Sequence, residues 1–107
     1  MYKNIEKKTK LVLKDQIAYQ PGQVVSKTLV QNESVSITLF SFDKGEEIST
    51  HAAAGDAMVT VLEGVGQFTV GEKIFHLCEG ETLIMPKDVP HSVLGEKQFK
   101  MQLIVSY

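Results

Sequence analysis

Two histidines are the residues most able to do chemistry in this sequence. His51 follows Gly45 after five intervening residues, and His91 follows the loop 86–90, which has proline at both ends. An imidazole can bind a divalent metal ion, anchor a ligand by hydrogen bonds or transfer a proton near neutral pH. His91 is the better candidate for a general base, because a rigid loop before it would hold its side chain at a pocket rim.

The other reactive groups form no complete catalytic set. Cys78 is the only cysteine, which excludes an internal disulfide and fits a reducing compartment. No Cys–His–acid arrangement is evident, and no glycine-rich phosphate loop precedes a helix. His76 shares strand parity with Ile74 and Cys78, which predicts a surface position.

The elements that must position these histidines are strands. Strand-forming residues recur between turn signals about every 8 to 12 residues, which is typical of an antiparallel sandwich or barrel. In the last predicted strand Phe99, Met101, Leu103 and Val105 alternate with Lys100, Gln102, Ile104 and Ser106. Glycines predict a turn at 64–66, between strands 58–63 and 67–70, and another at 95–97, before the last strand. No helix is expected.

The spacings around the two histidines resemble the two motifs of the cupin superfamily, small jelly-roll barrels. The first motif would run from Gly45 to Gly64 and the second from Gly80 to Gly95. The segments 61–64, 84–86 and 89–91 are similar to those of small bacterial cupins. The resemblance implies one all-β domain over residues 1–107, a single double-stranded β-helix. An N-terminal arm with edge strands (1–22) would precede the conserved barrel (24–106).

The resemblance also implies a metal site, which here is incomplete. His51 and His91 match the first and last metal ligands of the family, but Ala53 and Ala57 stand where a His and a Glu are usual. The expected cofactor is therefore one divalent ion (zinc, nickel, iron or manganese) held by the two histidines, or none. Asp56 adjoins a lost ligand position, but in a regular strand it points to the opposite face.

The small side chains of Ala53 and Ala57 would leave space for a ligand inside the barrel. Strand alternation adds three apolar side chains to this predicted ligand-binding set, which is then His51, His91, Ala53, Ala57, Val59, Phe99 and Met101.

Three functions stay open. The first is a non-enzymatic barrel that binds a small molecule with two histidines as polar anchors. The second is a divalent-metal-dependent cupin enzyme of the isomerase, decarboxylase or dioxygenase type. The third is a degenerate cupin that serves as a dimeric scaffold. A homodimer is expected from the resemblance, with N-terminal strands available to pair with a partner's sheet edge.

Charge and composition exclude several other classes of partner. The formal net charge is −2 in 107 residues, with lysine and glutamate interspersed. No basic patch predicts binding to nucleic acid or to a membrane surface. The N-terminal ten residues have no apolar signal core, and no apolar run reaches membrane-spanning length, so we expect a cytoplasmic protein.

Overall fold

The computed structural model describes all residues 1–107 and is almost entirely β-structure, as the sequence predicts. A one-turn 3-10 helix, η1 (Leu13–Gln16), precedes seven strands. No helix is long and apolar enough to cross a membrane. The strands are β1 (Val24–Gln31), β2 (Val35–Phe42), β3 (Glu47–His51), β4 (Asp56–Val70), β5 (Lys73–Cys78), β6 (Thr82–Met85) and β7 (His91–Ser106).

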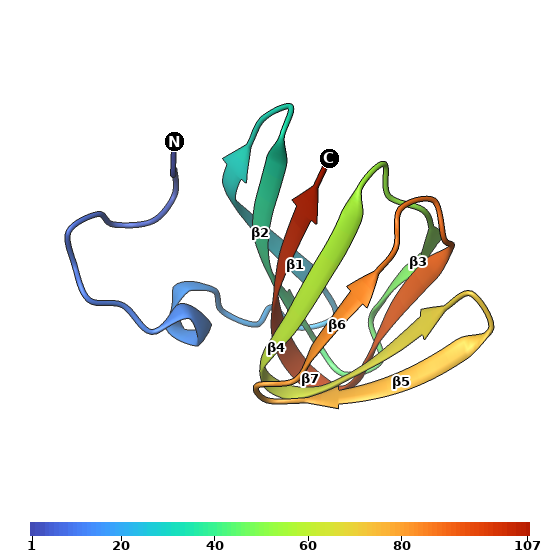
Figure 1. Cartoon of the computed structure of the whole chain (residues 1–107). Coiled ribbons are helices and arrows are strands. Elements are labelled where there is room, and N and C mark those ends of the chain that lie inside the picture. The colour runs from blue at the N-terminus through green and yellow to red at the C-terminus, as the bar shows by residue number, and fades with distance from the viewer.

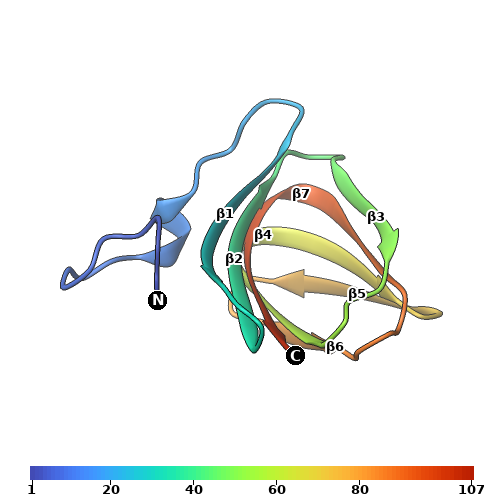
Figure 2. The same ribbon diagram turned by 90° about the horizontal axis from the view of Figure 1, so that it is seen from above.

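The strands form one antiparallel sheet that curves around a common interior (Figures 1 and 2). The main order is β1-β2-β7-β4-β5, while β3 pairs with β7 and β6 pairs with β4. The C-terminal half of β7 pairs with β2 and its N-terminal half pairs with β3. Because β4 pairs with β7 along most of its length, these two strands are the centre of the barrel.

Two of the predicted turns are wrong, because both β4 and β7 run through them as single long strands. Register shifts on β4, between Val61 and Glu63 and between Gly64 and Gly66, mark bulges rather than a turn. A Cβ atom on Gly66 would lie 2.7 Å from the Phe99 ring. A Cβ on Gly95 would lie 2.7 Å from the carbonyl oxygen of Asp43. These glycines allow neighbouring parts of the chain to approach closely. In sequence, a glycine that serves this purpose looks the same as a glycine in a turn.

Apolar side chains fill the barrel interior. Phe99 stacks on Phe42 with ring centroids 4.5 Å apart, and Phe68 meets Phe99 edge-on at 6.0 Å. The buried cluster consists of Phe42, Ala57, Val59, Val61, Phe68, Leu77, Met85, Val93, Phe99, Met101 and Val105.

The N-terminal arm covers part of the outer face of the sheet and otherwise extends to one side of the barrel (Figure 1). Ile17 packs there in a second apolar cluster with Leu29 and Leu39. The buried Lys100 donates a hydrogen bond of 2.6 Å from its Nζ to the carbonyl oxygen of Lys14. The arm is therefore attached to the barrel by the apolar contacts of Ile17 and by the hydrogen bond from Lys100 to the 3-10 helix.

Candidate ligand site at the barrel rim

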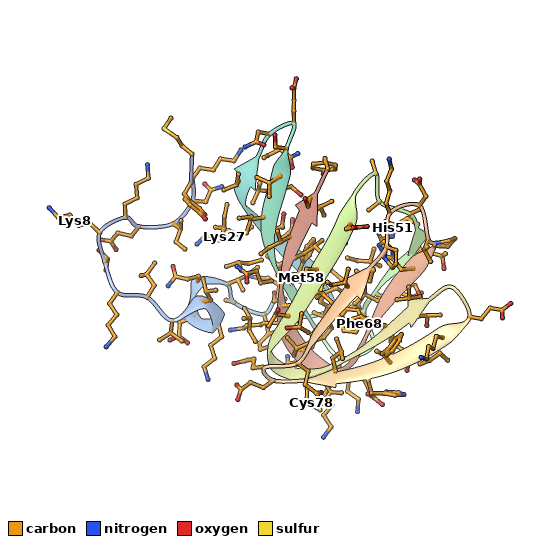
Figure 3. All side chains as sticks on the ribbon, viewed as in Figure 1. Lys8, Lys27, His51, Met58, Phe68 and Cys78 are labelled. Atoms are coloured by element: carbon orange, nitrogen blue, oxygen red, sulfur yellow. The ribbon has the colours of Figure 1, made fainter.

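His51 and His91 come together although forty residues of sequence separate them. They are directly opposite each other in the pairing of β3 with β7. Their ring centroids are 4.4 Å apart, with an angle of 68° between the ring planes. Figure 3 shows His51 on the β3 side of the barrel, away from the N-terminal arm. The structure thus brings both predicted histidines into one site.

The two histidines differ in burial. His91 points to the same side of β7 as the core residue Val93, and only 4% of its surface is exposed. Its neighbour on β4 is Val70, which packs against the core. His51 is exposed and lies at the solvent side of the pair. The pair therefore forms part of the barrel rim, with His91 as its inner member and His51 as its outer member.

The loop before β7 is held by main-chain hydrogen bonds. Asp88 adopts a left-handed conformation (φ 64°), and its amide donates to the carbonyl oxygen of Ala53 at 3.0 Å. The amide of Gly71 donates to the carbonyl oxygen of Pro90 at 2.8 Å. These bonds connect the loop to the segment before β4 and to the turn between β4 and β5. The loop therefore has a fixed position where β7 begins with His91.

Each imidazole uses the same nitrogen for an internal hydrogen bond. Nδ1 of His51 lies 2.9 Å from the carbonyl oxygen of Ser49, and Nδ1 of His91 lies 3.1 Å from that of Val89. A carbonyl oxygen can only accept, so Nδ1 carries the proton in both rings. In a neutral ring the unprotonated Nε2 then has a lone pair for a metal ion or for a hydrogen-bond donor.

The environment of His91 favours its neutral form. Burial lowers the pKa of the His91 imidazole below its usual value, and the nearby His51 acts in the same direction. The hydrogen bond to Val89 opposes this shift but does not reverse it. His91 therefore keeps an unprotonated Nε2 at neutral pH, as a ligand contact or a general base requires.

The residues around the pair do not complete a metal centre. Ala57 is buried in the core, and Ala53 packs against it. Asp56 accepts a hydrogen bond of 2.8 Å from the Lys87 amide, so its carboxylate secures a loop. No group of three or more His, Cys, Asp or Glu side chains is placed to hold a metal ion. A catalytic metal normally has three protein ligands, so the donors present do not fit one.

The three apolar residues predicted to line a pocket lie deep in the packed interior. Val59 and Phe99 are fully buried, and Met101 is 1% exposed. No pocket is found in the structure. Their role as ligand contacts stays a prediction, because a ligand would reach them only if core side chains moved.

Two elements of the site have no signal in the sequence. The carbonyl oxygens of Ser49 and Val89, which set the histidine tautomers, belong to the main chain, so residue type does not mark them.

The third histidine lies away from the rim on β5. Nδ1 of the exposed His76 is 3.0 Å from a carboxylate oxygen of Glu96, and its surface position agrees with the sequence.

The barrel fold is that of a cupin. The family model described as the cupin domain matches residues 38–107, and the chain belongs to this family. No curated protein matches the sequence.

Solved structures of similar chains share the whole fold. A conserved protein of unknown function from Streptococcus pyogenes is 39% identical, with a TM-score of 0.96 over 98% of this chain and 92% of that one. A cupin superfamily protein from Desulfitobacterium hafniense is 31% identical, with a TM-score of 0.94 over 99% of this chain and 97% of that one.

An enzyme is also among the structural neighbours. Salicylate 1,2-dioxygenase from Pseudoaminobacter salicylatoxidans is 20% identical, with a TM-score of 0.73 over 87% of this chain and 27% of that one. At this level of identity the likeness concerns the fold alone.

Proposed function

We propose that this protein is a non-enzymatic cupin module that binds a small molecule through His51 and His91. One observation carries the proposal: the two ring centroids are 4.4 Å apart and both Nδ1 atoms are used by main-chain carbonyls, so Nε2 of each ring is left for a ligand. A few polar groups that converge beside apolar surface are typical of a ligand site.

The chemistry of the pair defines the class of ligand. A neutral His91 offers an acceptor, so the ligand presents a donor such as a hydroxyl group. Ile48 and Ala53 pack against the core nearby, which favours a ligand that is partly apolar. His51 is exposed and His91 is only 4% exposed, so a ligand at the rim would meet His51 first and reach His91 from the same side.

A metal-dependent enzyme is the second candidate: the two rings are close enough to reach one ion, but they are only two of the three protein ligands that a catalytic metal normally has. Two imidazoles on one zinc ion, with bonds of about 2.1 Å, have centroids about 5 Å apart. The observed 4.4 Å is close to this value. In this reading a zinc, nickel, iron or manganese ion would need a further donor from the substrate or from water. This candidate ranks second because no third His, Cys, Asp or Glu side chain is placed to join the two histidines on one ion.

The oligomeric state proposed with this function is a homodimer. β1 is an edge strand of the sheet, and the arm adds one main-chain hydrogen bond to it, from Lys3 to Leu29. An edge strand can pair with a second chain. If neither a ligand nor a metal binds the rim, the dimeric scaffold is the function that stands.

The test is a ligand screen read at the histidines. Small hydroxylated compounds, aromatic and aliphatic, are added to protein with 15N-labelled histidine, and the imidazole signals are followed by NMR. We expect at least one compound to shift the His51 and His91 signals, and the His91→Ala variant to lose binding at least tenfold. The matched control is His76→Ala, which alters a histidine away from the rim and should bind normally.

Titration with zinc and with nickel separates the candidates. Binding at micromolar concentration that His51→Ala abolishes would replace the small-molecule proposal with the metal-dependent one. A rim that responds to neither metal nor compound at millimolar concentration would overturn both.

A further inference from the structure

The chain segments next to the two rim histidines are bonded to each other. β3 ends at His51, and the 52–55 corner connects it to Asp56, the first residue of β4. The 86–90 loop connects β6 to His91, the first residue of β7. Figure 1 shows both connections at the same end of the barrel. Two amides of the loop donate hydrogen bonds across to the other segment, so the chain after one histidine holds the chain before the other.

One of these two bonds depends on a side chain. The amide of Lys87 donates to Oδ1 of Asp56 at 2.8 Å. The next amide, that of Asp88, donates to the carbonyl oxygen of Ala53 at 3.0 Å, and both partners of this second bond are main-chain groups. A substitution of Asp56 can therefore remove the first bond without removing either partner of the second.

The backbone that carries the Asp56 carboxylate is fixed. Asp56 is paired with Ser106 near the end of β7. A Cβ atom on Gly55, the residue before Asp56, would collide with the carbonyl oxygen of Ser106, so the corner lies directly against β7. The short side chain of Asp56 therefore reaches the loop from a fixed point of the sheet.

One carbonyl group of the loop orients the His91 ring. The carbonyl oxygen of Val89 lies 3.1 Å from Nδ1 of His91, and Val89 is two residues after Lys87. Between them Asp88 has a φ of 64°, and the amide of Val89 donates to the carbonyl oxygen of Pro86 at 3.2 Å. A left-handed conformation is uncommon outside glycine and persists only where neighbouring contacts hold it. The bond from Lys87 is one of those contacts.

We propose that Asp56 is a positioning residue for His91. Its carboxylate holds the loop so that the carbonyl oxygen of Val89 faces Nδ1 and the proton stays off Nε2. The inference rests on the proposed function and adds a residue that acts on the ligand site through the loop. Without Asp56 the Val89 carbonyl is no longer fixed, and a neutral His91 ring can carry its proton on either nitrogen. Fewer rings then accept a ligand's hydrogen bond at Nε2.

The test compares Asp56→Ala with Asp56→Asn, which keeps an oxygen for the Lys87 amide. Long-range 1H–15N NMR spectra at pH 8 report the His91 tautomer, and hydrogen exchange reports the Lys87 amide. In Asp56→Ala we expect the Lys87 amide to exchange at least tenfold faster and the His91 proton to be shared between both ring nitrogens. Asp56→Asn should restore the pattern of the parent chain in both measurements.

Glu81→Ala is the matched control. The exposed Glu81 also accepts a main-chain amide with its carboxylate, that of Cys78 at 2.7 Å. It lies just before β6, whereas the 86–90 loop follows the other end of that strand. This variant should leave the His91 spectrum unchanged. Circular dichroism confirms that each variant is folded.

Other results would overturn the proposal in distinguishable ways. If His91 keeps its proton on Nδ1 in Asp56→Ala, the positioning role is refuted and the proposed function stands. Equal changes at His91 in Asp56→Ala and Glu81→Ala also refute it, because the effect would then be a general loss of order. So does an Asp56→Asn variant that behaves like Asp56→Ala, because the acceptor oxygen would then not be the cause. A parent chain with the His91 proton on Nε2 contradicts the proposed function itself, and with it this role of Asp56.

Discussion

The barrel interior and the barrel rim differ in the kind of side chain they contain and in what those side chains can bind. The interior is a closed apolar cluster in which Phe42, Phe68 and Phe99 pack ring against ring. The rim has two imidazoles, each with one nitrogen bonded and one nitrogen available. Ala57 stands where the cupin motif has a metal ligand, and it is part of the closed cluster. This chain therefore separates stability, which depends on the interior, from the proposed recognition, which depends on the rim.

The largest expected effect comes from opening the interior. Phe99→Ala removes a fully buried ring that contacts two other phenylalanines. Large-to-small core changes of this kind cost about 3–5 kcal/mol. Urea unfolding should show a loss of that size. A loss below about 1 kcal/mol would mean that the interior is not tightly packed.

A smaller effect is expected where two strands approach most closely. A Cβ on Gly64 would lie 1.9 Å from the carbonyl oxygen of Gln98, and Gly64 has a φ of 79°. Gly80 has a similar φ, 83°, but nothing lies within 4 Å of its Cβ position. Gly80→Ala should cost about 1 kcal/mol for backbone conformation alone. Gly64→Ala should cost about 2 kcal/mol more. Equal losses in chemical unfolding would show that the contact is relieved without cost.

The rim should make stability depend on pH. The folded-state pKa of His91 is lowered by burial, so its contribution to stability is fully present above the unfolded-state pKa of about 6.5. The contribution is lost as pH falls through the lower, folded-state pKa. The free energy of unfolding of the parent chain, measured from pH 7.5 downward, should therefore fall more steeply than that of His91→Gln. Parallel curves for the two proteins would contradict this account of His91.

The smallest effect on stability is expected at the outer histidine. His51→Ala changes an exposed residue, so the free energy of unfolding should change by less than about 0.5 kcal/mol. The same change removes a group that lowers the pKa of His91. An NMR titration should therefore show a higher His91 pKa in the variant. If stability falls by several kcal/mol, His51 belongs to the packed interior and the comparison fails.

Alternation and spacing predicted the barrel because both are local properties of the chain. Phe99 and Met101 face the interior as predicted, and His51 and His91 meet as the motif spacing implies. The roles of Gly66 and Gly95 were not predictable, since a bulge or a close approach needs glycine as much as a turn does.

The other unpredicted features depend on how the strands are paired. That Met58 lies beside Ile84 and Ile104 follows only from the strand register, which brings three strands together at this point. The closed interior depends on how large side chains from several strands fill one volume. The hydrogen bonds that set the histidine tautomers are accepted by main-chain carbonyls, so no residue type in the sequence predicts them.

The central claim is that both rim histidines keep the proton on Nδ1 and leave Nε2 available. A long-range 1H–15N NMR spectrum of the imidazoles at pH 8 tests it most directly, with His76 as the histidine away from the rim. We predict that His51 and His91 both show the protonated Nδ1 and unprotonated Nε2 pattern of the neutral ring. A protonated Nε2 on either residue would contradict the account, because that ring could then neither accept a ligand's hydrogen bond nor bind a metal through Nε2.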